Sequence, residues 1–310
     1  MRRSVKGGRR RQDSGRRLGA RRRCSHPHYR GITTMALAQP FQLETPAVGS
    51  PLPLIDLPAY CPGCGKGADA GALRDRLYVC GCGHHHSLHA EGWIALLPDG
   101  GSWREHWTDL EPRDWLGWEQ PKAYRTTLEH ARAHGLNEAV RAGSATLSGY
   151  QIWLGVFDFR FVGGTLGAVA GERLALALER AAATDRPFVL VSASGGARMQ
   201  EGVLALMQMA KVNAAVGRLH AAGVPYISIL TNPTFGGTAA SLALLADVNI
   251  AEPGAAIGFT GPRVIRQATY ADLPPGFQSA EFQLSHGQVD MVVGRGELRR
   301  VVAHLLEVLC

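Results

Sequence analysis

From residue 149 onward, short apolar runs alternate with glycine-rich turns and with longer segments whose apolar residues recur at helical spacing. The runs are rich in β-branched residues, as buried strands are, and they lie at residues 152–161, 188–192, 226–230, 248–251 and 257–259. Buried strands that alternate with helices are typical of an α/β domain with a parallel sheet. The pattern therefore predicts repeated strand–turn–helix units.

The residues between the strands predict the helices of these units. The first helix ends near residue 183, shortly before Arg186-Pro187. The second extends to about residue 222, because its apolar residues keep helical spacing until Gly223 and Pro225 terminate it. The third ends near residue 245.

The N-terminal half of the chain has a different organisation. Residues 36–58 are rich in proline and apolar residues without a clear period, and they predict a linker. Residues 91–148 are polar and contain four tryptophans, which we expect to pack a helical segment onto the main domain. We therefore divide the chain into a basic tail with a linker (1–58), a cysteine module (59–90) and a main domain (91–310).

The net charge of +7 comes from one end of the chain. Residues 1–34 contain twelve Arg or Lys residues and one acid, which leaves 21 basic and 25 acidic residues in the remainder, a net charge of −4. The tail lacks the apolar segment of a secretory signal. It fits a transit peptide or a chain whose true start is Met35, and a nucleic-acid-binding arm is a less favoured alternative. Without a run of eighteen apolar residues, we predict no membrane span.

Four cysteines indicate a metal site. Cys61-Pro-Gly-Cys64 and Cys80-Gly-Cys82 are separated by fifteen residues. Four thiolates at such spacing are typical of a tetrahedral structural zinc site in a zinc ribbon, whose closed coordination shell leaves no catalytic water. The module at 59–90 is therefore predicted to be a zinc ribbon that binds one Zn²⁺.

Two glycine pairs, Gly195-Gly196 and Gly236-Gly237, follow predicted strands and precede predicted helices. They start 41 residues apart, which is one strand–helix unit, so they should occupy equivalent places at the carboxyl ends of strands. Backbone N–H groups at such helix starts can hold an oxyanion. Each pair alone could be only a tight turn. Ser194 resembles half of a nucleophile elbow but lacks the rest of the motif, and no P-loop or dinucleotide fingerprint is present.

Longer motifs around these glycines resemble the carboxyltransferase β subunit of multisubunit acetyl-CoA carboxylase, the bacterial and plastid type. The resemblance covers about residues 61–305. It rests on Ser-Ala-Ser-Gly-Gly-Ala-Arg-Met-Gln-Glu (192–201), Leu-Met-Gln-Met-Ala-Lys (206–211), Thr-Asn-Pro-Thr-Phe-Gly-Gly (231–237), Asn-Ile-Ala-Glu-Pro (249–253), Ile-Gly-Phe-Thr-Gly-Pro-Arg-Val-Ile (257–265) and Leu-Pro-Pro-Gly-Phe-Gln-Ser-Ala-Glu-Phe (273–282).

The resemblance implies a crotonase-like superhelix of strand–turn–helix units, preceded by the zinc ribbon. It implies transfer of a carboxyl group from carboxybiotin on a biotin carrier protein to acetyl-CoA, giving malonyl-CoA, the first committed step of fatty acid synthesis. Two alternatives stay open: the same transfer to another acyl-CoA in a specialised pathway, and an inactive zinc-ribbon binding homologue.

The resemblance also implies roles for individual residues. The family's oxyanion-binding amide pair corresponds to Gly195 and Gly196, and Gly236 and Gly237 match a motif of the same cleft. Arg198 is a candidate contact for a CoA phosphate, with a salt bridge as its alternative. Related β subunits carry Cys-x-x-Cys twice, whereas the second pair here is one residue shorter. We expect four Cys ligands, with a residue of the run His84–His86 as the alternative to Cys82.

The same resemblance implies partners. A carboxyltransferase α subunit completes the site, in an α2β2 assembly, and the biotin carboxyl carrier protein and the ATP-binding biotin carboxylase supply the carboxyl group. This chain alone is then expected to be inactive. A cytoplasmic rather than plastid location is expected. The zinc ribbon has few basic residues, so a nucleic acid is not an expected ligand.

Overall fold

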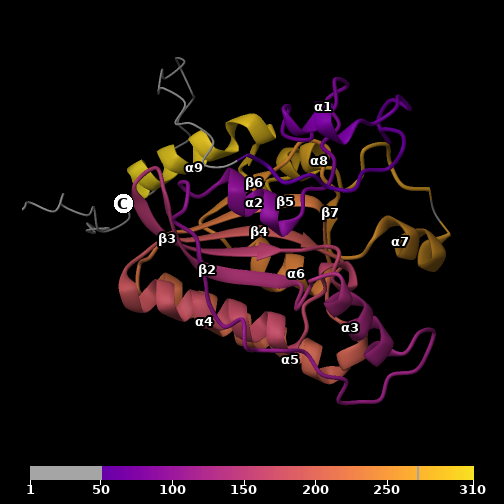
Figure 1. Ribbon diagram of the computed structural model, residues 1–310, viewed down its shortest axis with the longest axis horizontal. Coiled ribbons are helices and arrows are strands. Elements are labelled where there is room, and N and C mark those ends of the chain that lie inside the picture. Colours follow the sequence, from indigo (N-terminus) through magenta and orange to yellow (C-terminus); the bar gives the residue numbers. More distant parts are fainter. Residues whose placement is uncertain (1–50, 271) are drawn as a thin grey trace, which may run out of the picture.

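A mixed sheet of eight strands runs through the computed structural model, which describes residues 51–270 and 272–310 (Figure 1). The predicted basic tail and most of the predicted linker lie outside the described residues. The strand order is β1-β2-β3-β4-β5-β6-β8, and β7 pairs with β5. The strands are β1 Arg104–Glu105, β2 Val140–Leu147, β3 Tyr150–Phe157, β4 Phe188–Ser194, β5 Tyr226–Phe235, β6 Val248–Ala251, β7 Ile257–Gly258 and β8 Met291–Val292.

The predicted strand–turn–helix alternation is confirmed from β3 onward. Strands β3, β4, β5, β6 and β8 are parallel neighbours, and β4 is buried along its whole length. Strand β5 continues to Phe235, further than the predicted residue 230, because Thr234 pairs with Ile257 of β7.

The antiparallel hairpin β2–β3 differs from the expectation for residues 91–148, whose polar composition predicts a connecting region with one helical segment. That expectation is wrong over Val140–Leu147. Small and polar residues lower the mean hydropathy of this strand. Its buried positions largely alternate with half-buried Arg141, Ser144 and Thr146, which is the pattern of a strand with one wetter face.

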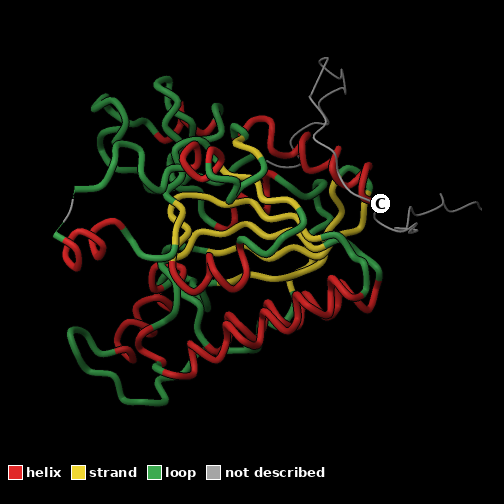
Figure 2. Tube along the Cα trace, turned by 180° about the vertical axis from the view of Figure 1, so that it is seen from behind, coloured by secondary structure: helices red, strands yellow, loops and turns green. Residues whose placement is uncertain are grey.

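Helices cover both faces of the sheet, as Figures 1 and 2 show. Helices α4 (Ala168–Thr184) and α5 (Val203–Ala221) share one apolar core with the sheet. Helices α2 (Ala90–Leu96) and α9 (Arg295–Leu309) share a second core on the opposite face, together with residues of the cysteine module. The strand ends that carry the glycine pairs therefore lie between two packed layers.

The remaining helices are short. They are α1 Ala70–Arg74, α3 Tyr124–Ala133, α6 Gly236–Thr238, α7 Pro262–Thr269 and α8 Ala280–Ser285, with 3-10 turns η1 Val162–Gly164 and η2 Met199–Glu201 and a π-helical turn η3 Ala239–Ala243. Trp118 packs beside α3, as predicted, whereas Trp107 stacks on Trp153 of β3 and Trp115 is exposed. In the described part of the chain, no helix is both long and apolar enough to cross a membrane.

Candidate active site and metal centre

The two glycine pairs meet at the carboxyl ends of the neighbouring strands β4 and β5. Ser194 pairs with Thr234 at the end of the parallel ladder, after a shift of register that follows Ser192. Parallel neighbours end at the same edge of a sheet, which is where open α/β sheets bind ligands. The sequence-based expectation that the pairs occupy equivalent places is met.

Gly196 and Gly236 face each other at van der Waals distance. A Cβ atom built on Gly196 would lie 3.2 Å from the Cα of Gly236, and one built on Gly236 would lie 3.0 Å from the Cα of Gly196. Both residues also have positive φ, +112° and +63°, which side chains other than glycine rarely adopt. Both positions thus need glycine for two independent reasons, and the backbones of the two turns lie against each other.

The amide groups of the four glycines have different partners. The N–H of Gly195 donates to the carbonyl of Gly163 at 2.9 Å, and the N–H of Gly236 donates to Phe259 at 2.8 Å. The N–H of Gly196 donates to the hydroxyl of Ser194 at 3.1 Å. The N–H of Gly237 opens helix α6, where no preceding helical turn offers a carbonyl.

Buried hydroxyl groups hold the two strand ends together. Ser192 and Thr234 lie 3.1 Å apart between their oxygens, and Ser194 and Thr238 lie 2.8 Å apart. All four side chains are fully buried. The hydroxyl of Ser194 therefore links the end of β4 to helix α6, and the alternative of a nucleophilic serine receives no support from its placement.

The placement of Arg198 favours the salt-bridge alternative over a contact with a CoA phosphate, because its side chain is buried and paired. Its side chain is 0% exposed, and its guanidinium is paired with the carboxylates of Glu138 and Glu201. The hydroxyl of Tyr124 also accepts from it, at 3.2 Å, and the ring of Phe161 lies 5.0 Å below it. The ion pairs of Arg198 lie in the interior of the protein, whereas the salt-bridge alternative placed them on a helix surface or at an interface.

Burial and charge shift two pKa values in this cluster in the same direction. Burial alone would lower the pKa of Arg198, but the two carboxylates, Glu138 foremost, outweigh burial and raise that pKa, so the cation is locked in its charged form. Burial raises the pKa of Tyr124, which keeps its hydroxyl neutral and able to donate to Glu201 at 2.7 Å. The sequence analysis assigned no role to Tyr124, Glu138 or Glu201, although Tyr124, in Lys-Ala-Tyr (122–124), and Glu201 both lie in segments that resemble the family.

The four predicted cysteines form one cluster. Their sulfur atoms all lie within 4.8 Å of one another, with 3.8 Å between Cys61 and Cys82 and 3.8 Å between Cys64 and Cys80. Tetrahedral Zn–S bonds of about 2.3 Å place sulfur atoms about 3.8 Å apart. The donor set and its spacing therefore fit a tetrahedral Zn²⁺ ion, and the short Cys80-Gly-Cys82 knuckle brings both of its sulfurs into the cluster.

The neighbouring groups favour four thiolate ligands over a histidine. Hydrogen bonds from the Cys82 backbone and from Cys61 lower the pKa of Cys80 to about 7, toward the thiolate form that binds metal. His85 is engaged elsewhere, since its Nε2 accepts from the N–H of Arg295 at 3.2 Å. Among the described residues, the cluster of ligand atoms comprises cysteines alone.

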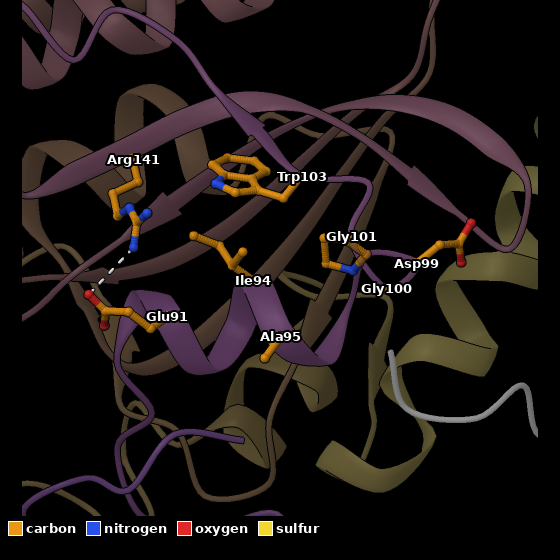
Figure 3. A pocket seen from close by; sticks show the side chains of 9 residues that line it. Glu91, Ile94, Ala95, Asp99, Gly100, Gly101, Trp103 and Arg141 are labelled. Atoms are coloured by element: carbon orange, nitrogen blue, oxygen red, sulfur yellow. Dashed lines mark hydrogen bonds and ion pairs between the residues drawn. The ribbon is translucent and has the colours of Figure 1, made fainter. Parts of the chain in front are cut away.

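Two cavities lie away from the glycine pairs. One, of about 280 Å³, opens between helix α2 and the loop before β1, with Trp103 on one wall and the Arg141–Glu91 ion pair at its end (Figure 3). The other, of about 180 Å³, separates the cysteine knuckle from the ends of β5 and β6 and is lined by His85, Asn232 and Glu252. Neither cavity is lined by a residue of the pairs Gly195-Gly196 and Gly236-Gly237.

Comparison with known proteins agrees with the geometry. Residues 108–275 match the family model described as a carboxyl transferase domain. The chain is 50% identical over 248 residues to the acetyl-coenzyme A carboxylase carboxyl transferase subunit beta 2 of Roseiflexus castenholzii, covering 79% of this chain and 82% of that protein. It is 45% identical to the corresponding subunit beta of Thermus thermophilus, covering 87% of this chain and 96% of the relative.

Solved structures show the same fold. The transcarboxylase 12S structure with bound methylmalonyl-coenzyme A superposes with a TM-score of 0.61 and 26% identity over 71% of this chain, and this chain spans 41% of the transcarboxylase chain. A chain of the Pseudomonas malonate decarboxylase MdcD-MdcE hetero-dimer superposes with a TM-score of 0.52 and 27% identity, covering 66% of this chain and 80% of that one.

These likenesses confirm the predicted fold class, a crotonase-like α/β superhelix, with an N-terminal four-cysteine cluster compatible with a zinc ribbon. The similarity in sequence extends over most of the chain and of its relatives. The chain therefore belongs to the family of acetyl-coenzyme A carboxylase carboxyl transferase β subunits.

Proposed function

We propose that the protein is the β subunit of a carboxyltransferase that moves a carboxyl group from carboxybiotin, on a carrier protein, to acetyl-CoA and so forms malonyl-CoA. The observation that carries this proposal is the close approach of Gly196 to Gly236, which brings backbone amides of two strand ends together at the carboxyl edge of the sheet, where we propose the substrate cleft. Such a cleft suits a reaction in which negative charge develops on a thioester oxygen.

The chain's own contribution is to hold that charge. When the methyl group of acetyl-CoA loses its proton, the thioester oxygen becomes an enolate oxygen. We assign the binding of this oxygen to the amide of Gly196, whose acceptor in the free chain is the Ser194 hydroxyl, and to the amide of Gly237 at the start of helix α6. Gly195 and Gly236 then act as the framework, because their amides hold neighbouring carbonyls. Carboxybiotin would supply the carboxyl group when the carrier protein is bound, and the biotin that remains after its release would accept the proton from the acetyl methyl group.

The zinc ribbon has a structural role in this proposal. Cys61, Cys64, Cys80 and Cys82 would hold one Zn²⁺ through four thiolates, which closes its coordination shell and leaves it no part in the reaction.

The assembly in this proposal contains a carboxyltransferase α subunit, in an α2β2 arrangement, together with the biotin carboxyl carrier protein and biotin carboxylase. Three observations support a partner beside the cleft. The transcarboxylase chain is much longer than this chain, and the malonate decarboxylase neighbour is a hetero-dimer. Large apolar side chains are also exposed shortly after Gly195-Gly196: Met199, Val203, Leu206 and Met207. We expect the assembly to be cytoplasmic, as in a bacterial enzyme.

Reconstitution tests the proposal. The chain, combined with an α subunit and carboxylated carrier protein, should convert acetyl-CoA to malonyl-CoA, and the chain alone should not. Propionyl-CoA and butyryl-CoA, assayed in parallel, decide between acetyl-CoA and a longer acyl group as the substrate. No carboxylation of any of the three esters by a correctly assembled complex would refute the proposed activity.

A further inference from the structure

The first and second glycine turns of the chain are joined along their backbones. The first turn (residues 163–167) follows strand β3, and the second (residues 195–196) follows β4. The N–H of Leu166 donates to the carbonyl of Gly196 at 2.8 Å, and the N–H of Arg198 donates back to Leu166 at 3.0 Å. Together with the bond from Gly195 to Gly163, this ladder makes the position of the second turn depend on the first.

The side chain of Arg198 reinforces the same junction. Its Nη2 donates to the carbonyl of Thr165 at 2.7 Å, and its Nε donates to the hydroxyl of Thr165 at 3.3 Å. The hydroxyl of Thr165 in turn donates to Val162 at 2.7 Å. The guanidinium of Arg198 thus binds both the backbone carbonyl and the side-chain hydroxyl of Thr165 in the first turn.

Buried carboxylates fix the opposite side of the guanidinium. Glu138, just before β2, pairs with Arg198 through both of its oxygens. Glu201 accepts from Arg198 at 3.1 Å through one oxygen, and through the other it accepts from the N–H of Ala168, at the start of helix α4, at 2.5 Å. A carboxylate is favoured at that helix end. Arg198 and both carboxylates are at most 3% exposed.

We propose that Arg198 is a positioning residue for carboxyl transfer, which sets the orientation of the Gly196 amide in the cleft. The inference rests on the proposed function above. The rigid guanidinium fork can hold Thr165, Glu138 and Glu201 at the same time, whereas the single ammonium of lysine cannot match this geometry. Replacement by lysine keeps the charge but releases the first turn, and the second turn moves with it. A displacement of about 1 Å at a reacting group can reduce the rate by about 100-fold.

The test compares Arg198→Lys with Arg295→Lys in the full chain, reconstituted with the α subunit and the carrier. Arg295 is a matched control, since it is also buried, pairs with a glutamate through both oxygens and donates to a backbone carbonyl, but it has no contact with the glycine turns. The readouts are kcat, KM for acetyl-CoA, the unfolding midpoint, and amide hydrogen exchange over residues 195–197.

We expect Arg198→Lys to lower kcat by about 100-fold with KM within about threefold, and to speed exchange over residues 195–197. Arg295→Lys should lower the unfolding midpoint to a similar degree while kcat stays within about twofold. Equal kcat losses in the two variants, or unchanged exchange in Arg198→Lys, would overturn the inference. If Arg198→Lys does not fold, Glu138→Gln replaces it, with the same expected direction. A wild-type complex without activity would refute the proposed function, whereas the exchange comparison would still decide the positioning role.

Discussion

Arg295 holds both carboxylate oxygens of Glu252, at 2.7 and 2.9 Å, in a buried ion pair between helix α9 and the end of strand β6. The same guanidinium donates to the carbonyl of Leu77 in the cysteine module at 2.9 Å and lies 5.2 Å over the ring of Trp93 in α2. A single side chain of helix α9 therefore joins the cysteine module to the sheet and to helix α2.

The first prediction concerns this ion pair. Glu252→Gln leaves the Arg295 charge buried without a counter-charge, so the free energy of unfolding should fall by about 3–5 kcal/mol. Denaturant unfolding followed by circular dichroism measures this. Glu297→Gln, which removes a largely exposed partner of Arg300, is the control and should change stability by less than about 1 kcal/mol. Equal stability of the two variants would show that the ion pair does not hold the ribbon in place.

The second prediction concerns the metal centre. The wild-type chain should contain about one zinc ion, and Cys82→Ala should lose it, because the 3.8 Å spacing of the sulfurs includes Cys82. His84→Ala should keep it, since the cluster of ligand atoms comprises cysteines alone. Metal analysis of the purified variants decides between the four-cysteine site and a site that includes a histidine. Zinc retained in Cys82→Ala and lost from His84→Ala would reverse the assignment.

Much of the fold could be predicted because its determinants are local. Each glycine pair follows its own apolar strand, and a separation of one strand–helix unit was enough to predict that the pairs are equivalent. The contact between Gly196 and Gly236 follows from that equivalence. The cysteine cluster could likewise be predicted from ligand spacing alone.

The role of Arg198 could not be predicted in this way, because its partners are distant in the sequence. Glu138 lies 60 positions and Tyr124 lies 74 positions before it, in a region of polar composition that carries no signal of burial. An arginine beside an oxyanion turn is equally consistent with a ligand contact and with an internal ion pair. Only the packing of α3 and β2 against the turn distinguishes the two.

The third prediction concerns the cleft. Gly196→Val should reduce carboxyl transfer by at least about 100-fold, because the new side chain would meet Gly236 and the backbone has a φ of +112°. Turnover by the reconstituted complex measures the effect. The control is Gly217→Ala on helix α5, where an added Cβ would have no neighbouring atom within 4 Å. We expect this variant to keep the activity of the wild type. The Gly196→Val chain should still bind zinc and the α subunit, and normal turnover would contradict the assignment of the Gly196 amide to the oxyanion.

The fourth prediction is a dependence of stability on pH. Burial would raise the pKa of Asp158, but hydrogen bonds and charge from Arg160, at 2.9 and 2.5 Å, outweigh burial and hold that pKa below its usual value. A carboxyl whose pKa is lower in the folded state stabilises the fold above its unfolded pKa of about 3.9, and this contribution is lost as the pH falls through the folded pKa.

Asp158→Asn should therefore be less stable than wild type at pH 7, and the difference should shrink below about pH 4. Urea unfolding at pH 7, 5, 4 and 3 tests this, with the exposed Asp75→Asn as the control variant. A stability difference between Asp158→Asn and wild type that stays constant down to pH 3 would show that the Arg160 pair does not govern the ionisation of Asp158.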